Sequence, residues 1–201
     1  MSTTPSQARG FVPTRKAGGQ PPAAANRYPT GSNRAQIFIG DAVFLDANRK
    51  IQVFNQQTSA NAPAVLGVVV GLYTSTGRPG THNAAKPIAV SAAGFVDVID
   101  DPDTFFEVQC SASVGPSQIG QFAQPTSGAG NVGVTANGQS TYMINDTTVV
   151  TAAGHAFQVY SLSPRELDGL GGPNNKVIVR ISNHVFRRST RLQGPLEAAD
   201  A

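Results

Sequence analysis

The stretch GFVDVIDDPDTFFEVQC, residues 94–110, is the most concentrated run of aromatic and β-branched residues near the middle of the 201-residue chain. Strand-forming residues flank its central Asp-Asp-Pro-Asp sequence on both sides, and polar residues alternate with apolar ones after it. Pro102 fixes its own backbone and biases Asp101 toward an extended conformation, while aspartate side chains bond to nearby N–H groups, so these residues predict a turn. The stretch therefore predicts a hairpin at the centre of the hydrophobic core.

Similar short apolar runs, bounded by Gly, Pro, Asn or Asp, recur along the rest of the chain. They predict strands at 37–39, 42–45, 51–54, 65–73, 87–90, 131–134, 140–144, 147–151, 156–160 and 176–183. Asn137-Gly138 is a two-residue hairpin signal between two of these runs. Because no long apolar stripe with helical period is present, the predicted fold class is all-β, a small barrel or sandwich built from antiparallel hairpins.

The composition is typical of a turn-rich β protein with a polar but weakly charged surface. Gly (21) and Pro (14) are frequent, whereas charged residues make up only 13% of the chain. Such a surface suits contact with other protein subunits. The single Cys110 excludes an intrachain disulfide, and we expect it to be a buried structural thiol. No signal peptide or transmembrane helix is recognised, so we expect no membrane partner.

Charge and proline content divide the chain into three parts. Residues 1–35 contain five prolines and five cations with no acidic residue, and we expect an extended basic arm that is disordered when alone in solution. Residues 36–186 form a slightly acidic β-rich body, either one unit or two lobes at about 36–110 and 111–186. Residues 187–201 are expected to be a flexible, charged tail.

Motifs that would carry chemistry are weak in this sequence. Residues 128–133 fit G-x-G-x-x-G, but a Pro-Thr-Ser loop precedes them and a hairpin signal follows, instead of the strand and helix that a dinucleotide site needs. His82, His155 and His184 are far apart. The aspartates of the central turn lack the glycine and distal glutamate of a calcium loop. We therefore predict no catalytic, cofactor or metal site.

The basic arm supports three hypotheses. Its cations could contact nucleic-acid phosphates, although they are sparsely spaced. It could be an unstructured tail without a partner. It could also reach across neighbouring protein subunits and fold on binding, with Phe11, Val12 and Tyr28 as anchors. We favour the third hypothesis.

Five segments of the body resemble a known family. They are GDAVFLD (40–46), LGVVVG (66–71), AGFVDV (93–98), DPDTFFEVQ (101–109) and VIVRISNH (177–184). Together they resemble the β-barrel head-decoration, or cement, proteins of tailed bacteriophages, with the DDP turn and the final strand as the main features. The resemblance covers about residues 36–186 in scattered short motifs, and the arm has no counterpart in it.

The resemblance implies a non-enzymatic virion structural protein, made in the host cytoplasm, that binds outside the capsid and cements neighbouring major capsid subunits. The implied partners are the major capsid protein and further copies of the chain in a dimer or trimer, not a membrane, nucleic acid or cofactor. The alternative is a head- or tail-associated β module that binds carbohydrate or a host receptor. The candidate capsid contacts in the arm are Arg9, Phe11, Val12, Arg15, Lys16, Arg27, Tyr28 and Arg34.

Overall fold

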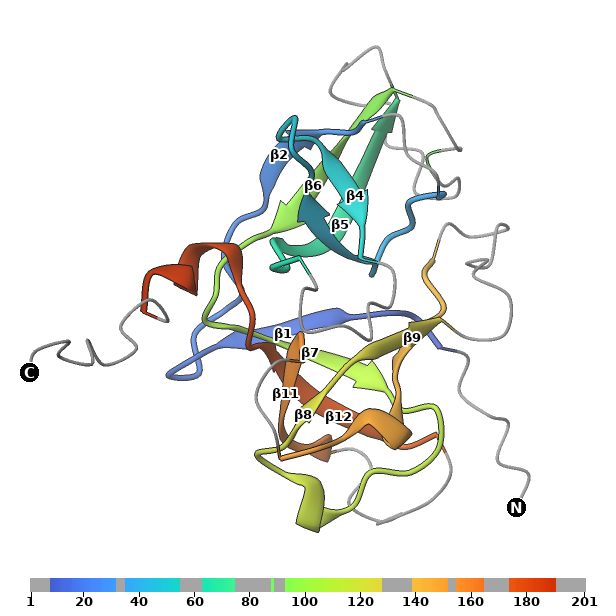
Figure 1. Ribbon diagram of the computed structural model, residues 1–201, viewed down its shortest axis with the longest axis vertical. Coiled ribbons are helices and arrows are strands. Elements are labelled where there is room, and N and C mark those ends of the chain that lie inside the picture. Colours follow the sequence, from blue (N-terminus) through green and yellow to red (C-terminus); the bar gives the residue numbers. More distant parts are fainter. Residues whose placement is uncertain are drawn as a thin grey trace, which may run out of the picture.

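The computed structural model describes residues 8–31, 35–54, 63–74, 88, 93–127, 139–151, 155–164 and 174–190. These residues form antiparallel strands and short 3-10 turns (Figure 1), which confirms the all-β prediction. The strands are β1 (Val12–Lys16), β2 (Asn26–Pro29), β3 (Ala42–Leu45), β4 (Ile51–Val53), β5 (Gly67–Thr74), β6 (Gly94–Ile99), β7 (Thr104–Gln109), β8 (Phe122–Ala123), β9 (Pro125–Ser127), β10 (Tyr142–Ile144), β11 (Phe157–Leu162) and β12 (Lys176–Ile181). The 3-10 turns are η1 (Pro116–Gln118), η2 (Asp146–Thr148) and η4 (Val185–Thr190).

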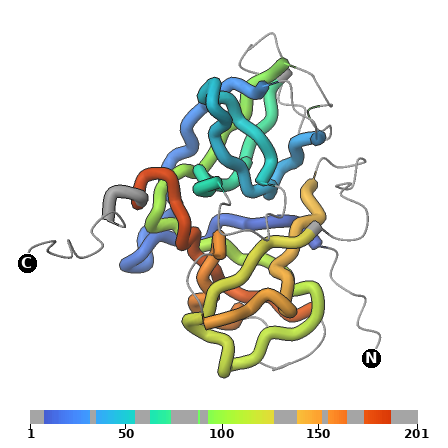
Figure 2. Tube along the Cα trace, in the orientation of Figure 1, coloured from blue at the N-terminus to red at the C-terminus, as the bar shows by residue number. Residues whose placement is uncertain are grey.

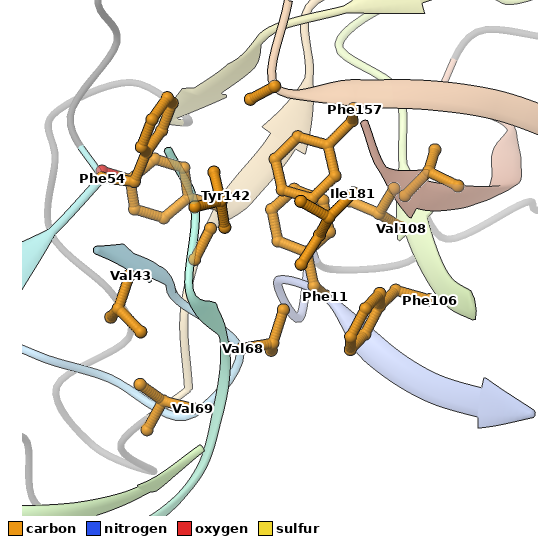
Figure 3. Packing of buried hydrophobic residues seen from close by; sticks show 14 of the residues in the cluster. Phe11, Val43, Phe54, Val68, Val69, Phe106, Val108, Tyr142, Phe157 and Ile181 are labelled. Carbon is orange, nitrogen blue, oxygen red and sulfur yellow. The ribbon is translucent and has the colours of Figure 1, made fainter. Parts of the chain in front are cut away.

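The strands build two five-stranded sheets that share one core. One sheet has the order β1-β7-β12-β11-β8 and the other β2-β6-β5-β3-β4, while β9 and β10 form a separate pair. Side chains from both sheets meet between them, including Val43 and Val68 from one and Phe106 and Phe157 from the other (Figure 3). Burial of this continuous apolar cluster is the main force that holds the two sheets together.

The central stretch is a connection between the sheets and not a hairpin. β6 pairs with β2 and β5, whereas β7 pairs with β1 and β12. The turn is present, because the Thr104 N–H donates to the Asp101 carbonyl at 3.1 Å. The predicted pairing is wrong because each strand finds partners on both of its edges elsewhere in the chain.

Residues 8–31 belong to the folded body, so the predicted boundary at Gln36 is wrong. β1 pairs antiparallel with β7, from Val12 opposite Glu107 to Lys16 opposite Thr104, and β2 pairs antiparallel with β6. The N-terminal stretch therefore runs beside the whole connection between the sheets (Figure 2), and the two form one bent ribbon across both sheets. Large apolar residues are few in this stretch, but strand pairing and a single buried Phe11 suffice to fix it.

Some further predictions along the chain are wrong, and others concern residues outside the described ranges. The predicted strand at 147–151 is wrong, because the Asn145 side chain accepts from Thr147 N–H (3.1 Å) and caps the 3-10 turn η2. The predicted lobe boundary near residue 110 is also wrong, since β7 belongs with the later strands. The short strands β8 and β9 were not predicted. The Asn137-Gly138 hairpin, the Gly-rich loop at 128–133 and the end of the tail at 191–201 lie outside the described residues.

The N-terminal stretch enters the body where two glycine backbones touch. Gly10 and Gly40 have φ of +70° and +92°, and Phe11 N–H donates to the Gly40 carbonyl at 2.9 Å. A Cβ on Gly10 would lie 2.6 Å from both the Gly40 oxygen and the Ser140 Cβ. Both the conformation and the close approach require glycine here, so this contact fixes how β1 meets the body.

Candidate interaction surface

Half of the predicted arm contacts are used inside the chain. Phe11 is 1% exposed, and its ring stacks on Phe157 with a centroid distance of 4.5 Å. The Lys16 ammonium pairs with Asp101 at 2.5 Å. These residues attach β1 to its own body and are not available to a neighbouring subunit.

Arg27 belongs to a cluster on the outer side of the β2-β6-β5 sheet. Its Nε donates to Asp97 Oδ1 at 2.9 Å, and its guanidinium lies 3.8 Å from the centre of the Tyr73 ring. The Tyr73 hydroxyl donates to the same carboxylate at 2.7 Å. The cation is thus paired and stacked within the chain, which is the stronger kind of exposed ion pair.

Tyr28 binds the corner between β6 and β7. Its hydroxyl donates to the Asp100 carboxylate, and the Asn26 amide donates to both oxygens of that carboxylate at 2.9 and 3.0 Å. Partial burial and the hydrogen bond to Asp100 raise the pKa of Tyr28 above its ordinary value. The aspartates of the central turn are therefore partners for N-terminal side chains, and Arg187 pairs with the last of them, Asp103.

The remaining predicted contacts face outward. Arg9, Val12 and Arg15 are exposed, with 43% of Val12 accessible. Arg34 lies outside the described residues. The structure therefore splits the predicted set: among its described members, Arg9, Val12 and Arg15 are exposed and form no ion pair within the described chain, whereas the exposed Arg27 is already paired with Asp97.

These three residues lie on the outer face of the β1-β7-β12-β11 sheet. The guanidinium of Arg15 is 5.8 Å from the centre of the Phe105 ring, and Tyr160 contacts that ring at a centroid distance of 4.5 Å. On the next strand, Arg180 stands opposite Phe105 in register and its Nε donates to Gln158 at 2.8 Å. Since 48% of Tyr160 is exposed, this row presents cations and an aromatic ring to solvent.

A depression crosses the same face. A groove of about 480 Å³ lies between β1 and the end of β11, with Glu107 and Ile178 among its lining residues. A smaller hollow of about 160 Å³ adjoins it, shares Val12 and Glu107, and is lined also by Arg9 and Lys176. We call this surface, made of Arg9, Val12, Arg15, Glu107, Lys176 and Ile178, the cationic trough.

Sequence reasoning found only part of the cationic trough. Lys176 and Ile178 belong to a run whose alternation indicates an outward face, but nothing local shows that this face adjoins Arg9 and Arg15. That proximity depends on β7 pairing with both β1 and β12. Only knowledge of which strands pair, and in which register, brings these residues together, and no sequence motif supplies it.

Other residues considered for chemistry are dispersed in the fold. His184 is 1% exposed, its Nδ1 accepts from Phe186 N–H at 3.0 Å, and burial lowers its pKa. Cys110 is fully buried as expected, and burial followed by the charge of Asp146 raises the pKa of its thiol to about 12. Within the described part of the chain, no three metal-ligating side chains are grouped closely enough to hold an ion.

Among the residues that the structure describes, no helix has the length and apolar character needed to cross a membrane. No protein-family model matches the sequence, and no curated protein matches it.

Proposed function

We propose that this protein is a non-enzymatic virion structural protein that binds the outside of a tailed-phage capsid and cements neighbouring major capsid subunits. The observation that supports it most is the arrangement of the five segments on which the family resemblance rests. They are scattered over residues 40–184 in the sequence but adjoin one another in the fold.

Backbone contacts connect these segments directly. Gly40 N–H donates to the Val69 carbonyl at 2.8 Å, and β5 then pairs with β6. Val65, next to the 66–71 segment, donates to the Asn183 carbonyl at 2.8 Å and forms a bridge with His184. β7 pairs with β12. The segments that carry the resemblance therefore form one continuous structural unit that joins the two sheets.

The geometry suits a protein that works by binding. Because the bent ribbon belongs to both sheets, a load applied to one sheet is carried to the other through backbone hydrogen bonds. A protein that binds the assembled shell but not free subunits stabilises the shell by mass action, and many copies add their contributions. Such a protein acts in the virion after synthesis in the host cytoplasm, with the major capsid protein and further copies of itself as partners.

The sheet edges formed by β1 and β2 favour contact through side chains over addition of a strand. β1 and β2 are edge strands, and each contains a proline, Pro13 and Pro29. β1 also has a register irregularity between Pro13 and Arg15. Proline and bulges are common ways to prevent strand pairing at a sheet edge. The proposed capsid contact therefore uses an outer sheet face. Arg9, Val12 and Arg15 make this contact from a folded strand, in place of the flexible arm expected from the sequence.

One observation favours a second candidate, a module that binds carbohydrate or a host receptor. The exposed ring of Tyr160 is supported from one side by Phe105, and a supported aromatic ring is a common platform for a sugar. In this case the protein would lie on the tail or on capsid projections and not between capsid subunits.

Electron microscopy of the virion tests both candidates. The proposal expects density of this fold at repeated positions on the outer shell, in contact with more than one capsid subunit. Density confined to the tail tip would support the receptor-binding candidate and overturn the proposal. Purified protein should also restore occupancy to shells that lack it, and should raise the temperature at which those shells rupture.

A further inference from the structure

We propose that the cationic trough binds an extended acidic peptide segment that presents both acidic and aliphatic side chains to the sheet. As a site on the capsid subunit this rests on the proposed function, but the chemistry is argued from the trough itself. The outer face offers cations, an exposed valine and one central acidic residue, and each of these selects a property of the occupant.

The cations select a negatively charged occupant. Elsewhere in the described part of the chain, Lys16, Arg27 and Arg187 are paired with aspartates of the ribbon. The cations of this outer face, Arg9, Arg15, Lys176 and Arg180, form no ion pair with a described residue. Like charges gathered on one face, with no counter-ion among the described residues, attract an acidic partner and raise its association rate.

The apolar residues select an occupant that is not uniformly polar. Val12 is 43% exposed at the rim, and Ile178 lies on the floor of the groove. Ile178 is already covered, with 5% exposed, so Val12 supplies most of the apolar surface that an occupant would remove from water, at about 25 cal/mol per Å². Successive side chains of an extended peptide point to opposite sides, and Val12 lies on the same sheet face as the cations, so the side of the peptide that is turned to the trough must carry both acidic and aliphatic residues.

Glu107 favours a peptide over a nucleic acid as the occupant of the trough. It stands between Val12 and Ile178 in the strand register, and its carboxylate accepts from the Ser163 hydroxyl at 2.7 Å. A phosphate backbone carries a charge at every nucleotide and would place one beside this carboxylate. A mixed peptide can place an aliphatic residue or an N–H group there instead. The trough therefore favours the peptide.

Fluorescence anisotropy with the full chain tests this inference. The probe is a labelled ten-residue peptide with the repeat Asp-Asp-Val-Val, which carries both residue types on each side when it is extended. The competitors are deca-aspartate, a ten-nucleotide oligothymidylate and a lysine–valine peptide of the same pattern. We expect the aspartate–valine peptide to bind best, with an affinity that falls as salt rises. If it does not bind, or if the oligonucleotide binds as tightly, the inference is wrong.

Charge reversal locates the site. Arg15→Glu and, independently, Lys176→Glu should each weaken binding of the aspartate–valine peptide about tenfold or more. The matched control is Arg49→Glu on the exposed turn between β3 and β4, which should change affinity less than about twofold. Circular dichroism establishes that each variant is folded. Equal loss in the control would mean unspecific charge attraction and would overturn the proposal.

Glu107→Gln gives a separate readout, because it removes the charge while Ser163 keeps an acceptor. It should strengthen binding of deca-aspartate and the oligonucleotide relative to the aspartate–valine peptide. An unchanged order of affinities would contradict the role of Glu107. Shell occupancy then separates the two proposals. If the Arg15→Glu variant still decorates shells, the trough is not the capsid-binding site, and the proposed capsid function stands. If the unaltered protein fails to decorate shells, only the proposed capsid function is wrong.

Discussion

A buried carboxylic acid at the entry of the N-terminal stretch makes the stability of this protein depend on pH. Asp41 is 1% exposed and follows the glycine that contacts Gly10. One of its oxygens accepts from Phe38 N–H at 2.8 Å, while the other has no hydrogen-bond partner among the described residues. Burial raises the pKa of Asp41 from 3.8 to about 7, against the opposing effects of Ser140 and the Phe38 N–H.

The direction of the effect follows from proton binding. In the unfolded chain Asp41 ionises near its ordinary pKa, whereas in the folded protein it keeps its proton up to about pH 7. Between these values the folded state binds the extra proton, so the free energy of unfolding falls as pH rises and levels off above the folded pKa. At 1.36 kcal/mol for each tenfold change in proton affinity, the loss is at most about 4 kcal/mol.

Urea unfolding of the wild-type protein and Asp41→Asn, followed by circular dichroism from pH 5 to pH 8, measures this effect. The asparagine oxygen can still accept from Phe38 N–H but carries no charge. We expect the variant to be more stable than the wild type by about 1.6 kcal/mol at pH 5 and by up to about 4 kcal/mol at pH 8, because the unfolded chain is already ionised at pH 5 while the folded protein still holds the proton. A variant that is less stable than the wild type at pH 8 would refute the reasoning.

A second aspartate provides a control of opposite sign. Asp46 accepts from the backbone N–H groups of Asn48 and Lys50, and the hydrogen bond from Lys50 is the main cause of its lowered pKa. Its contribution to stability is therefore present above its unfolded pKa and is lost in acid. Asp46→Asn should be slightly less stable than the wild type at pH 7, and the same comparison of unfolding curves detects it.

Three further outcomes can be measured on the purified chain. Gly10→Ala should lower the free energy of unfolding by more than about 2 kcal/mol, because it adds a backbone clash to an unfavourable φ, whereas Gly18→Ala, with φ of +84° and open space around it, should cost only about 1 kcal/mol in the same urea titration. Tyr28→Phe should cost about 1–2 kcal/mol, since it removes a hydrogen bond to the Asp100 carboxylate, and equal stability would show that this bond contributes nothing. Cys110 should react with a thiol reagent far more slowly in the native protein than in urea, and fast native labelling would contradict its burial.

The strands themselves were largely predictable, but their partners were not. Alternation and turn residues located β3, β4, β6, β7, β11 and β12 because these signals are local. The Asp-Asp-Pro-Asp sequence encodes a change of direction, yet it does not encode whether the flanking strands then pair. That choice depends on competition from β1, β2, β5 and β12, which lie far away in the sequence.

The N-terminal stretch was misread for a related reason. Few large apolar residues and several prolines usually indicate disorder, since little surface can be buried. Here the stretch needs little burial of its own, because β1 and β2 add to sheets that other strands have already built. The composition of a segment indicates how much apolar surface the segment can bury by itself. It does not indicate whether the segment can pair with a sheet that other strands have formed.

The distribution of charge shows why the candidate site could not be assigned to the arm as such. A segment with five cations and no acidic residue suggests one basic surface, but strand register gives its cations different neighbours. Lys16 and Arg27 lie beside the aspartates of the ribbon and are neutralised there. Arg15 lies opposite Phe105 and forms no ion pair with a described residue, so it joins Arg180 and Lys176 on the outer face. The basic surface available to a partner is consequently a property of the assembled sheet, and charge changes at Arg15 and at Lys16 should affect binding and stability, respectively.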